Sequence, residues 1–210
     1  MIIFEDLTES IMQGNESKLI GIVQRALKSQ IPVQEILDGL IESMNIIGTK
    51  FKNGELFIPE LLMAAKTMKA GIEVIRPLFD KSGVKLSGRV VIGTVRGDLH
   101  DIGKNLVRML MEAAGYQVTD LGVDVPIEKF VDAVKSNRPN IVGLSALLTT
   151  TMPTMKLVIE SLIEAGVRNN VKVMVGGAPV TEKFAKEIGA DGYGSSAAAA
   201  VEVAKKLIAD

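Results

Sequence analysis

The chain contains no cysteine and no tryptophan, and only one histidine, His100, among its 210 residues. Without cysteine it can form no disulfide, no thiolate metal site and no cysteine nucleophile. The single histidine also excludes a metal site built from several imidazoles. A transition metal bound here would therefore take at most one imidazole ligand from the protein.

The chain also lacks an excess of either charge and a long apolar run. Its net charge is −1, so it lacks the excess of positive charge that binding to nucleic acid or an anionic membrane requires. The longest stretch without a charged residue, 139–155, contains Pro153 and is shorter than the roughly 20 apolar residues that a bilayer span needs. The first ten residues carry Glu5 and Asp6 and no basic residue, unlike a signal peptide. We expect neither nucleic-acid nor membrane binding, and a cytoplasmic location.

The first eighty residues have apolar side chains at helical spacing and no alternating pattern, which predicts a small antiparallel four-helix bundle. Breaks are expected at 14–15, 30–32 and 53–54, and Pro59 suits the first turn of a last helix over 59–79. The short polar segment KSGVKLSG, residues 81–88, is typical of a domain boundary. We therefore predict a helical domain over 1–83 and a second domain over 88–210.

Beyond this boundary, short runs rich in Val and Ile alternate with amphipathic segments, a βαβ pattern. It predicts a five-stranded, doubly wound parallel sheet of the flavodoxin or Rossmann kind. Such a sheet binds ligands at the carboxyl ends of its strands. The expected strands are 89–95, 117–121, 141–146, 171–175 and 192–194.

The loop after the first strand, residues 96–105, places Asp98 two residues before His100. It is neither a Walker A phosphate loop nor a GxGxxG turn. One interpretation is a polar loop in which Asp101 caps the next helix. The other is metal binding, because a carboxylate that accepts from one imidazole nitrogen leaves the other nitrogen free for a metal. One histidine cannot build a structural zinc site, so a macrocycle, a haem or a corrin, would have to supply the remaining ligands.

Three pieces at predicted strand ends carry a resemblance: DxHxxG as Asp98, His100 and Gly103, SxL as Ser145 and Leu147, and the pair Gly176 and Gly177. Together they resemble the cobalamin-binding signature of corrinoid proteins of methyltransferase systems. That family includes the methanol, methylamine and methoxyaromatic corrinoid proteins and the cobalamin-binding region of methionine synthase. The neighbouring stretches GDLHDIGKNLV, DLGVDVP and GLSALLT are similar too.

The resemblance implies a role for each piece. His100 would be the metal ligand, replacing the corrinoid's own lower base on cobalt, and the displaced nucleotide tail would insert into the α/β domain. Asp98 and Thr151 would complete a relay with His100, with Thr151 standing where methionine synthases have serine. The glycine pair would let the tail pass, although a tight turn also explains it. Further implied cofactor-binding residues are Gly97, Leu99, Asp101, Ile102, Gly103, Ser145, Leu147, Thr149, Tyr193 and Ser196.

The helical region resembles the cap that covers the methyl face of methylcobalamin, through Met44–Gly48, Gly54–Glu55 and Phe57–Leu62. The implied contacts with the upper face of the corrin are Phe51, Ile58 and Leu61. An apolar stripe in the core of any helical bundle is the ordinary alternative.

The implied function is methyl carriage: Co(I) accepts a methyl group from a substrate-specific methyltransferase, and methyl-Co(III) passes it to an acceptor methyltransferase. The chain has no room for a (β/α)₈ barrel of about 250 residues. We therefore expect a non-catalytic or co-catalytic corrinoid subunit that also needs a reductive activator.

Three alternatives remain. A cobalamin-dependent regulator or sensor usually adds a basic DNA-binding module and a cap tryptophan, whereas the first 81 residues hold 9 basic and 11 acidic side chains and no Trp. The small subunit of an adenosylcobalamin mutase shares DxHxxG but lacks this cap. A receiver module needs a carboxylate cluster at the first strand, where Gly97 stands. The sequence does not identify the methyl donor, the acceptor, the corrinoid's lower base or the oligomeric state.

Overall fold

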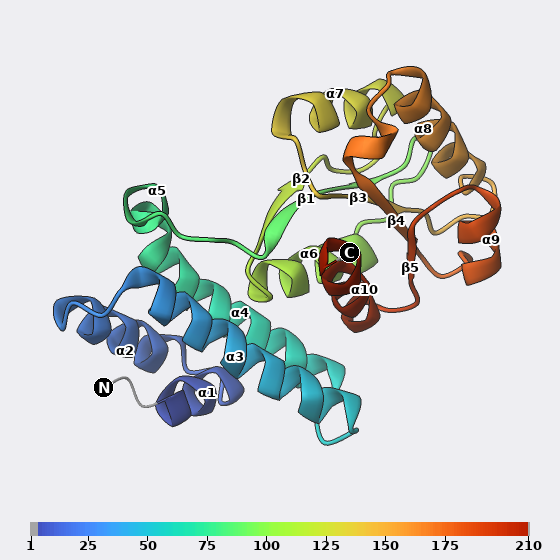
Figure 1. The fold of residues 1–210 in the computed structure, drawn as a ribbon. Coiled ribbons are helices and arrows are strands. Elements are labelled where there is room, and N and C mark those ends of the chain that lie inside the picture. Colours follow the sequence, from blue (N-terminus) through green and yellow to red (C-terminus); the bar gives the residue numbers. More distant parts are fainter. Residues whose placement is uncertain (1–3, 210) are drawn as a thin grey trace. The chain divides into compact units, whose positions relative to one another are not determined.

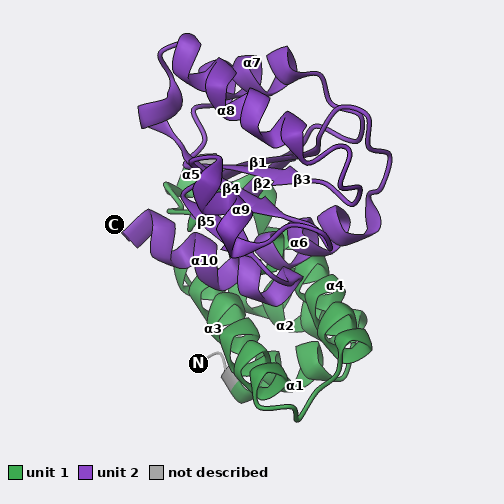
Figure 2. Ribbon diagram, turned by 90° about the vertical axis from the view of Figure 1, so that its right-hand side faces the viewer, with its two compact units in different colours: residues 1–87, 112–115 green, residues 88–111, 116–210 purple. Residues whose placement is uncertain are grey.

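The computed structural model describes residues 4–209 and divides into two compact units (Figure 2). The helical unit comprises Met1–Ser87 with Glu112–Gly115, and the α/β unit comprises Gly88–Met111 with Tyr116–Asp210. Within the described residues, no helix is both long and apolar enough to cross a membrane.

Four of the helices described in the helical unit form a bundle, as the apolar periodicity predicts (Figure 1). Their inward faces make a continuous apolar core, and Gly71 brings the last helix close to Leu19 of the second. Asn15 caps the second helix by accepting from the backbone N–H of Lys18 at 3.0 Å. The helices are α1 Phe4–Met12, α2 Glu16–Lys28, α3 Val33–Lys52 and α4 Ile58–Ile75.

The predicted end of the fourth helix was wrong. The helix ends at Ile75 rather than Phe79, and a 3₁₀ turn, η1 Arg76–Leu78, follows it. Pro77 is the reason, because it has no N–H to continue the helical ladder and its ring clashes with the preceding turn. A short helix, α5 Phe79–Ser82, then ends at Gly83 with a φ of +61°.

The α/β unit contains the predicted five-stranded parallel sheet, in the order β2-β1-β3-β4-β5. This is the doubly wound order in which β1 and β3 flank the switch point, where connections leave in opposite directions and open a crevice. The observed strand ends lie within one residue of the predicted ones. The strands are β1 Gly88–Thr94, β2 Tyr116–Asp120, β3 Ile141–Ser145, β4 Lys172–Gly176 and β5 Gly192–Gly194.

Helices cover both faces of this sheet (Figure 1). One face packs against α7 Ile127–Asn137 and α8 Pro153–Glu164, and its buried core includes alternate strand residues such as Val91, Val142 and Val173. The opposite face lies toward α6 Ile102–Ala113 and α10 Ala197–Ala209. The remaining elements are η2 Arg168–Asn170 and α9 Glu182–Glu187.

Candidate functional site

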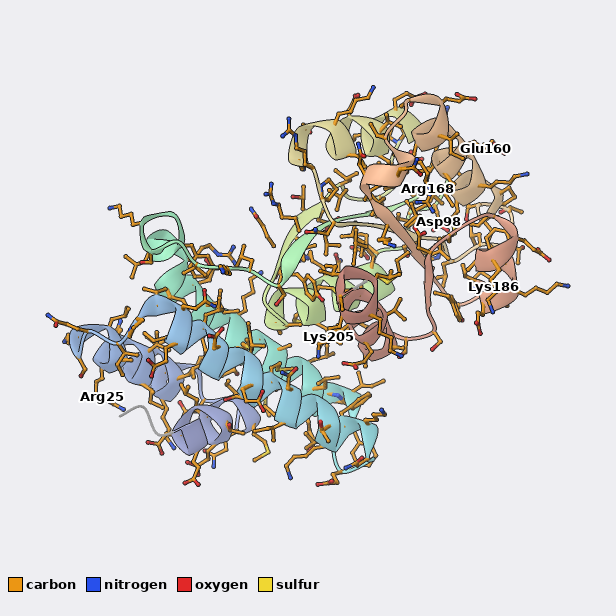
Figure 3. All side chains as sticks on the ribbon, viewed as in Figure 1. Arg25, Asp98, Glu160, Arg168, Lys186 and Lys205 are labelled. Carbon is orange, nitrogen blue, oxygen red and sulfur yellow. The ribbon has the colours of Figure 1, made fainter. Side chains whose placement is uncertain are left out.

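The loop between β1 and α6 holds Asp98 and His100 in direct contact. The Oδ1 atom of Asp98 lies 2.7 Å from Nδ1 of His100 and accepts the backbone N–H of the same histidine at 3.1 Å. The imidazole is 51% exposed, whereas the Asp98 side chain is completely buried. Figure 3 shows Asp98 inside the α/β unit, whereas Glu160 on α8 and Lys186 on α9 project from its surface. The carboxylate therefore fixes Nδ1 as the donor and leaves Nε2 available to a ligand.

The second carboxylate oxygen of Asp98 is held by the loop after β3. Oδ2 accepts from the Thr151 hydroxyl at 2.8 Å and from the backbone N–H groups of Leu147 and Leu148 at 2.7 and 3.2 Å. Burial raises the pKa of Asp98, but these bonds and those from His100 outweigh it and hold the pKa far below its ordinary value. Asp98 is thus a buried, fully hydrogen-bonded carboxylate that pairs with a partly exposed imidazole.

Two further residues close the loop. The Thr94 hydroxyl donates to the backbone carbonyl of His100 at 2.8 Å, and Asp124 accepts the Gly97 N–H at 2.7 Å. The backbone N–H of Asp124 donates to the Asp98 carbonyl at 2.9 Å. Gly97 has a φ of +84°, a conformation that glycine adopts without strain. The histidine is therefore presented by a loop whose backbone is tied to two neighbouring elements.

Beside His100 a cavity of about 520 Å³ runs between α6 and α10 over β3 and β4. Glycine opens it, because Gly143, Gly176 and Gly194 stand on the sheet face that turns toward these two helices. The cavity brings together most of the predicted cofactor-binding residues. They are Leu99, His100, Asp101, Ile102, Gly103, Ser145, Leu147, Gly176, Gly177, Tyr193 and Ser196.

The other predicted residues of the α/β unit lie outside the cavity lining. Gly97 lies exposed in the loop, Asp98 and Thr151 are buried and hydrogen-bonded to each other, and Thr149 is exposed. Gly177 lines the cavity, but its backbone conformation also requires glycine. Its φ is +129°, and an added Cβ would collide with the Ala146 carbonyl oxygen. The tight-turn explanation therefore applies to Gly177 whatever it contacts.

The predicted contacts in the helical unit differ in exposure. Ile58 is 58% exposed, Phe51 is half-buried, and Leu61 is 5% exposed within the core of the bundle. Phe57 was not among the predicted contacts, yet it is 71% exposed at the start of α4.

The prediction missed several residues that line the cavity. Ile92, Gly143 and Met174 share one level of the sheet, and period-two alternation from Ser145 and Gly176 could have located the last two. Lys104 also lines the cavity and is almost completely buried, with its Nζ 2.6 Å from Asp120 Oδ2. No pattern in the sequence pairs these two residues, because the contact depends on how α6 lies against β2.

Residues 88–202 match the B12 binding domain family, and residues 3–76 match a second family of the same description. The chain is a member of the B12-binding corrinoid protein family. It is 43% identical to dimethylamine corrinoid protein 1 of Methanosarcina acetivorans, over 99% of this chain and 98% of the relative. It is 47% identical to trimethylamine corrinoid protein 2 of Methanosarcina mazei, over 95% and 93%.

A solved structure shares the fold. The methanol:cobalamin methyltransferase complex MtaBC from Methanosarcina barkeri matches with a TM-score of 0.87 and 35% identity, over 98% of this chain and 79% of that one. The family and the cobalamin-type cofactor expected from DxHxxG, SxL and the glycine pair are thereby confirmed.

The site also fits a corrinoid on its own geometry. His100 presents Nε2, and the exposed apolar side chains of Leu99 and Ile102 flank it, as a flat, largely apolar macrocycle requires. The adjoining cavity has room for an appended group. Within the described residues no three His, Cys, Asp or Glu side chains gather as a metal site.

Proposed function

We propose that this chain is a corrinoid methyl carrier that works with methyltransferases, and that His100 is the protein ligand to cobalt. The observation that carries the proposal is the Asp98–His100 pair, a buried carboxylate holding a half-exposed imidazole at the mouth of a cavity. When bound, the corrinoid supplies a cobalt centre that takes up and releases a methyl group.

The residues of the chain then have distinct tasks. Asp98 orients the imidazole and, through Thr151, is itself held in place. Because Asp98 stays ionised and accepts from Nδ1, it would strengthen Nε2 of the imidazole as an electron-pair donor to a metal. The cavity between α6 and α10 receives the nucleotide tail of the corrinoid, with Ser145, Tyr193 and Ser196 among its lining residues.

The helical unit supplies the exposed apolar residues Phe57 and Ile58 for the methyl side of the corrin. These side chains would exclude water from a reactive cobalt–carbon bond. Leu61, a predicted contact, is buried in the core of the bundle. Phe51 remains a predicted contact.

The partners follow from the chemistry. A carrier needs one methyltransferase that loads the methyl group and a second that removes it, and we keep a reductive activator as a third partner. The named relatives make dimethylamine, trimethylamine and methanol systems the first donors to test. A cytoplasmic location remains a prediction from the sequence.

The first test is the absorption spectrum of the protein reconstituted anaerobically with hydroxocobalamin, beside His100→Ala and a remote control, Asp132→Asn on α7. We expect the wild type and the control to bind with the same histidine-ligated spectrum, and His100→Ala to bind with a different spectrum and lower affinity. If the wild type does not bind, or if all three spectra agree, the proposal is wrong.

A second test separates a carrier from a cobalamin-dependent regulator. The reduced, Co(I)-loaded protein is mixed with a methylamine methyltransferase and its substrate, and formation of the methyl-Co(III) spectrum is followed. A carrier gains this spectrum only when both are present. A regulator binds the cofactor but shows no such dependence.

A further inference from the structure

His100 is held at three atoms, and the third contact is independent of Asp98. Its Nδ1 and its backbone N–H both meet Asp98 Oδ1, at 2.7 and 3.1 Å. Its backbone carbonyl instead accepts the hydroxyl of Thr94 at 2.8 Å. The carboxylate therefore sets the rotation of the ring, while the hydroxyl fixes the main chain that carries the ring.

Thr94 is a rigid anchor for this contact. It is the last residue of β1 and is completely buried. Its backbone N–H donates to the Gly122 carbonyl and its carbonyl accepts from the Val125 N–H, both at 3.0 Å. A β-branched side chain has few χ1 rotamers, so the position of the hydroxyl is fixed by the sheet.

The His100 carbonyl depends on that hydroxyl because of where it lies in the chain. The first turn of α6 is closed by the Asn105 N–H, which donates to the carbonyl of Asp101 at 2.7 Å. The carbonyl of His100 precedes this bond by one residue and takes its donor from Thr94 instead. An apolar side chain at position 94 would leave this carbonyl without that donor.

Resting on the proposed function, we infer that Thr94 is a positioning residue for the cobalt ligand. Its hydroxyl fixes the main chain of His100 and, through it, the position from which Nε2 reaches the metal. Thr94 is not among the residues that line the cavity, so it acts through His100 and not on the cofactor. Removal of the Thr94 hydroxyl weakens the bond between His100 and cobalt, while the corrinoid still binds through the cavity.

The test compares Thr94→Val, which keeps the shape and removes the hydroxyl, with Thr94→Ser, which keeps the hydroxyl. Thr119→Val, on the exposed side of β2, is the matched control. Each protein, labelled with ¹⁵N-histidine, is loaded with cobalamin and reduced to Co(II). The ¹⁵N doublet in the electron paramagnetic resonance spectrum then reports the histidine-ligated fraction, whereas the cofactor's own ¹⁴N base gives a triplet. Circular dichroism and the amount of bound cobalt report folding and occupancy.

We expect Thr94→Val to lower the ratio of ligated to unligated cobalt by about three- to tenfold, the effect of one neutral hydrogen bond. Thr94→Ser and the control should match the wild type, and all variants should carry the same amount of cobalt. A Thr94→Val protein with the wild-type ratio would overturn the inference and leave the proposed function intact. A wild type without the ¹⁵N doublet would overturn the proposed function itself.

If Thr94→Val does not fold, Thr94→Ala replaces it in the comparison with Thr94→Ser. Equal ligated fractions in the alanine and serine variants would count against the inference in the same way. A merely structural role would lower the thermal midpoint of the alanine variant without changing the ratio in the folded protein.

Discussion

At the scale of single residues, the buried carboxylate of Asp98 links the site to the stability of the fold. Burial alone would favour its neutral form, but the bonds from Leu147, His100 and Thr151 favour the anion and lower its pKa. In the unfolded chain the group titrates near its ordinary value of 3.8. Between the folded and unfolded pKa values the unfolded chain therefore binds more protons than the folded one.

This difference predicts how stability changes with pH. The contribution of Asp98 is fully present above about pH 4 and is lost progressively as the pH falls toward the lower, folded pKa. Asp98→Asn should therefore give a protein without cofactor that is less stable at pH 7 but loses less stability on acidification. Denaturant melts from pH 7 to pH 3 measure both. The exposed control Asp132→Asn should follow the wild type. If Asp98→Asn lost as much stability on acidification as the wild type does, the prediction would be contradicted.

The sequence predicted the residues that the structure brings together around His100, but it did not predict two residues that hold the backbone of the loop. Asp98 and His100 are close in the chain and share a motif, and Thr151 was placed by its offset from Ser145. Thr94 was not predicted because its contact with His100 depends on how the loop folds back on the end of β1. Asp124 was not predicted because its contact with Gly97 exists only after β1 and β2 pair. No local pattern distinguishes such a threonine from any other residue of a buried strand.

At the scale of the elements, glycines shape the carboxyl ends of the central strands. Gly143 and Gly176 have no side chains to fill the space above the sheet where the cavity lies. Gly177 allows the backbone of the loop after β4 to pack closely against Ala146. An alanine at 177 would place its Cβ on the Ala146 carbonyl oxygen, in a backbone conformation with a φ of +129°. Steric clash and backbone strain then act together.

The comparison of Gly177→Ala with Gly189→Ala separates these two effects. Gly189, after α9, also has a positive φ, +76°, but an added Cβ there meets open space. We expect Gly189→Ala to cost about 1 to 2 kcal/mol of unfolding free energy, the usual penalty of a left-handed conformation. Gly177→Ala should cost at least about 3 kcal/mol, since strain and clash add. Urea denaturation measures both, and equal costs would show that the loop after β4 relaxes freely.

The elements themselves were largely predictable, for a physical reason. Buried parallel strands show as runs of Val and Ile, and amphipathic helices show a 3.6-residue period, so both are local signals. The end of α4 was misjudged because apolar residues continue at helical spacing beyond Ile75 to Phe79. Pro77 outweighed that periodicity, since a missing N–H acts on the backbone whatever the side-chain pattern.

At the scale of the molecule, the site residues around His100 belong to the α/β unit, and this unit also contains the whole cavity. A ligand that binds the folded state alone stabilises it by mass action, by about 2.7 kcal/mol at a free concentration one hundred times its dissociation constant. Cobalamin should therefore raise the unfolding midpoint of the α/β unit in calorimetry.

The size of this increase tests whether the cavity takes the nucleotide tail. Cobinamide has the same corrin ring but no nucleotide, so it can use His100 and the rim formed by Leu99 and Ile102 but cannot fill the space over Gly143. At equal concentration we expect cobinamide to raise the midpoint less than cobalamin does, and Gly143→Leu to reduce the cobalamin shift to the cobinamide value. The leucine variant should respond to cobinamide as the wild type does, because its change lies beneath the tail and away from the imidazole. Equal shifts for both ligands in the wild type would mean that the corrin ring alone accounts for binding and that the cavity has another occupant.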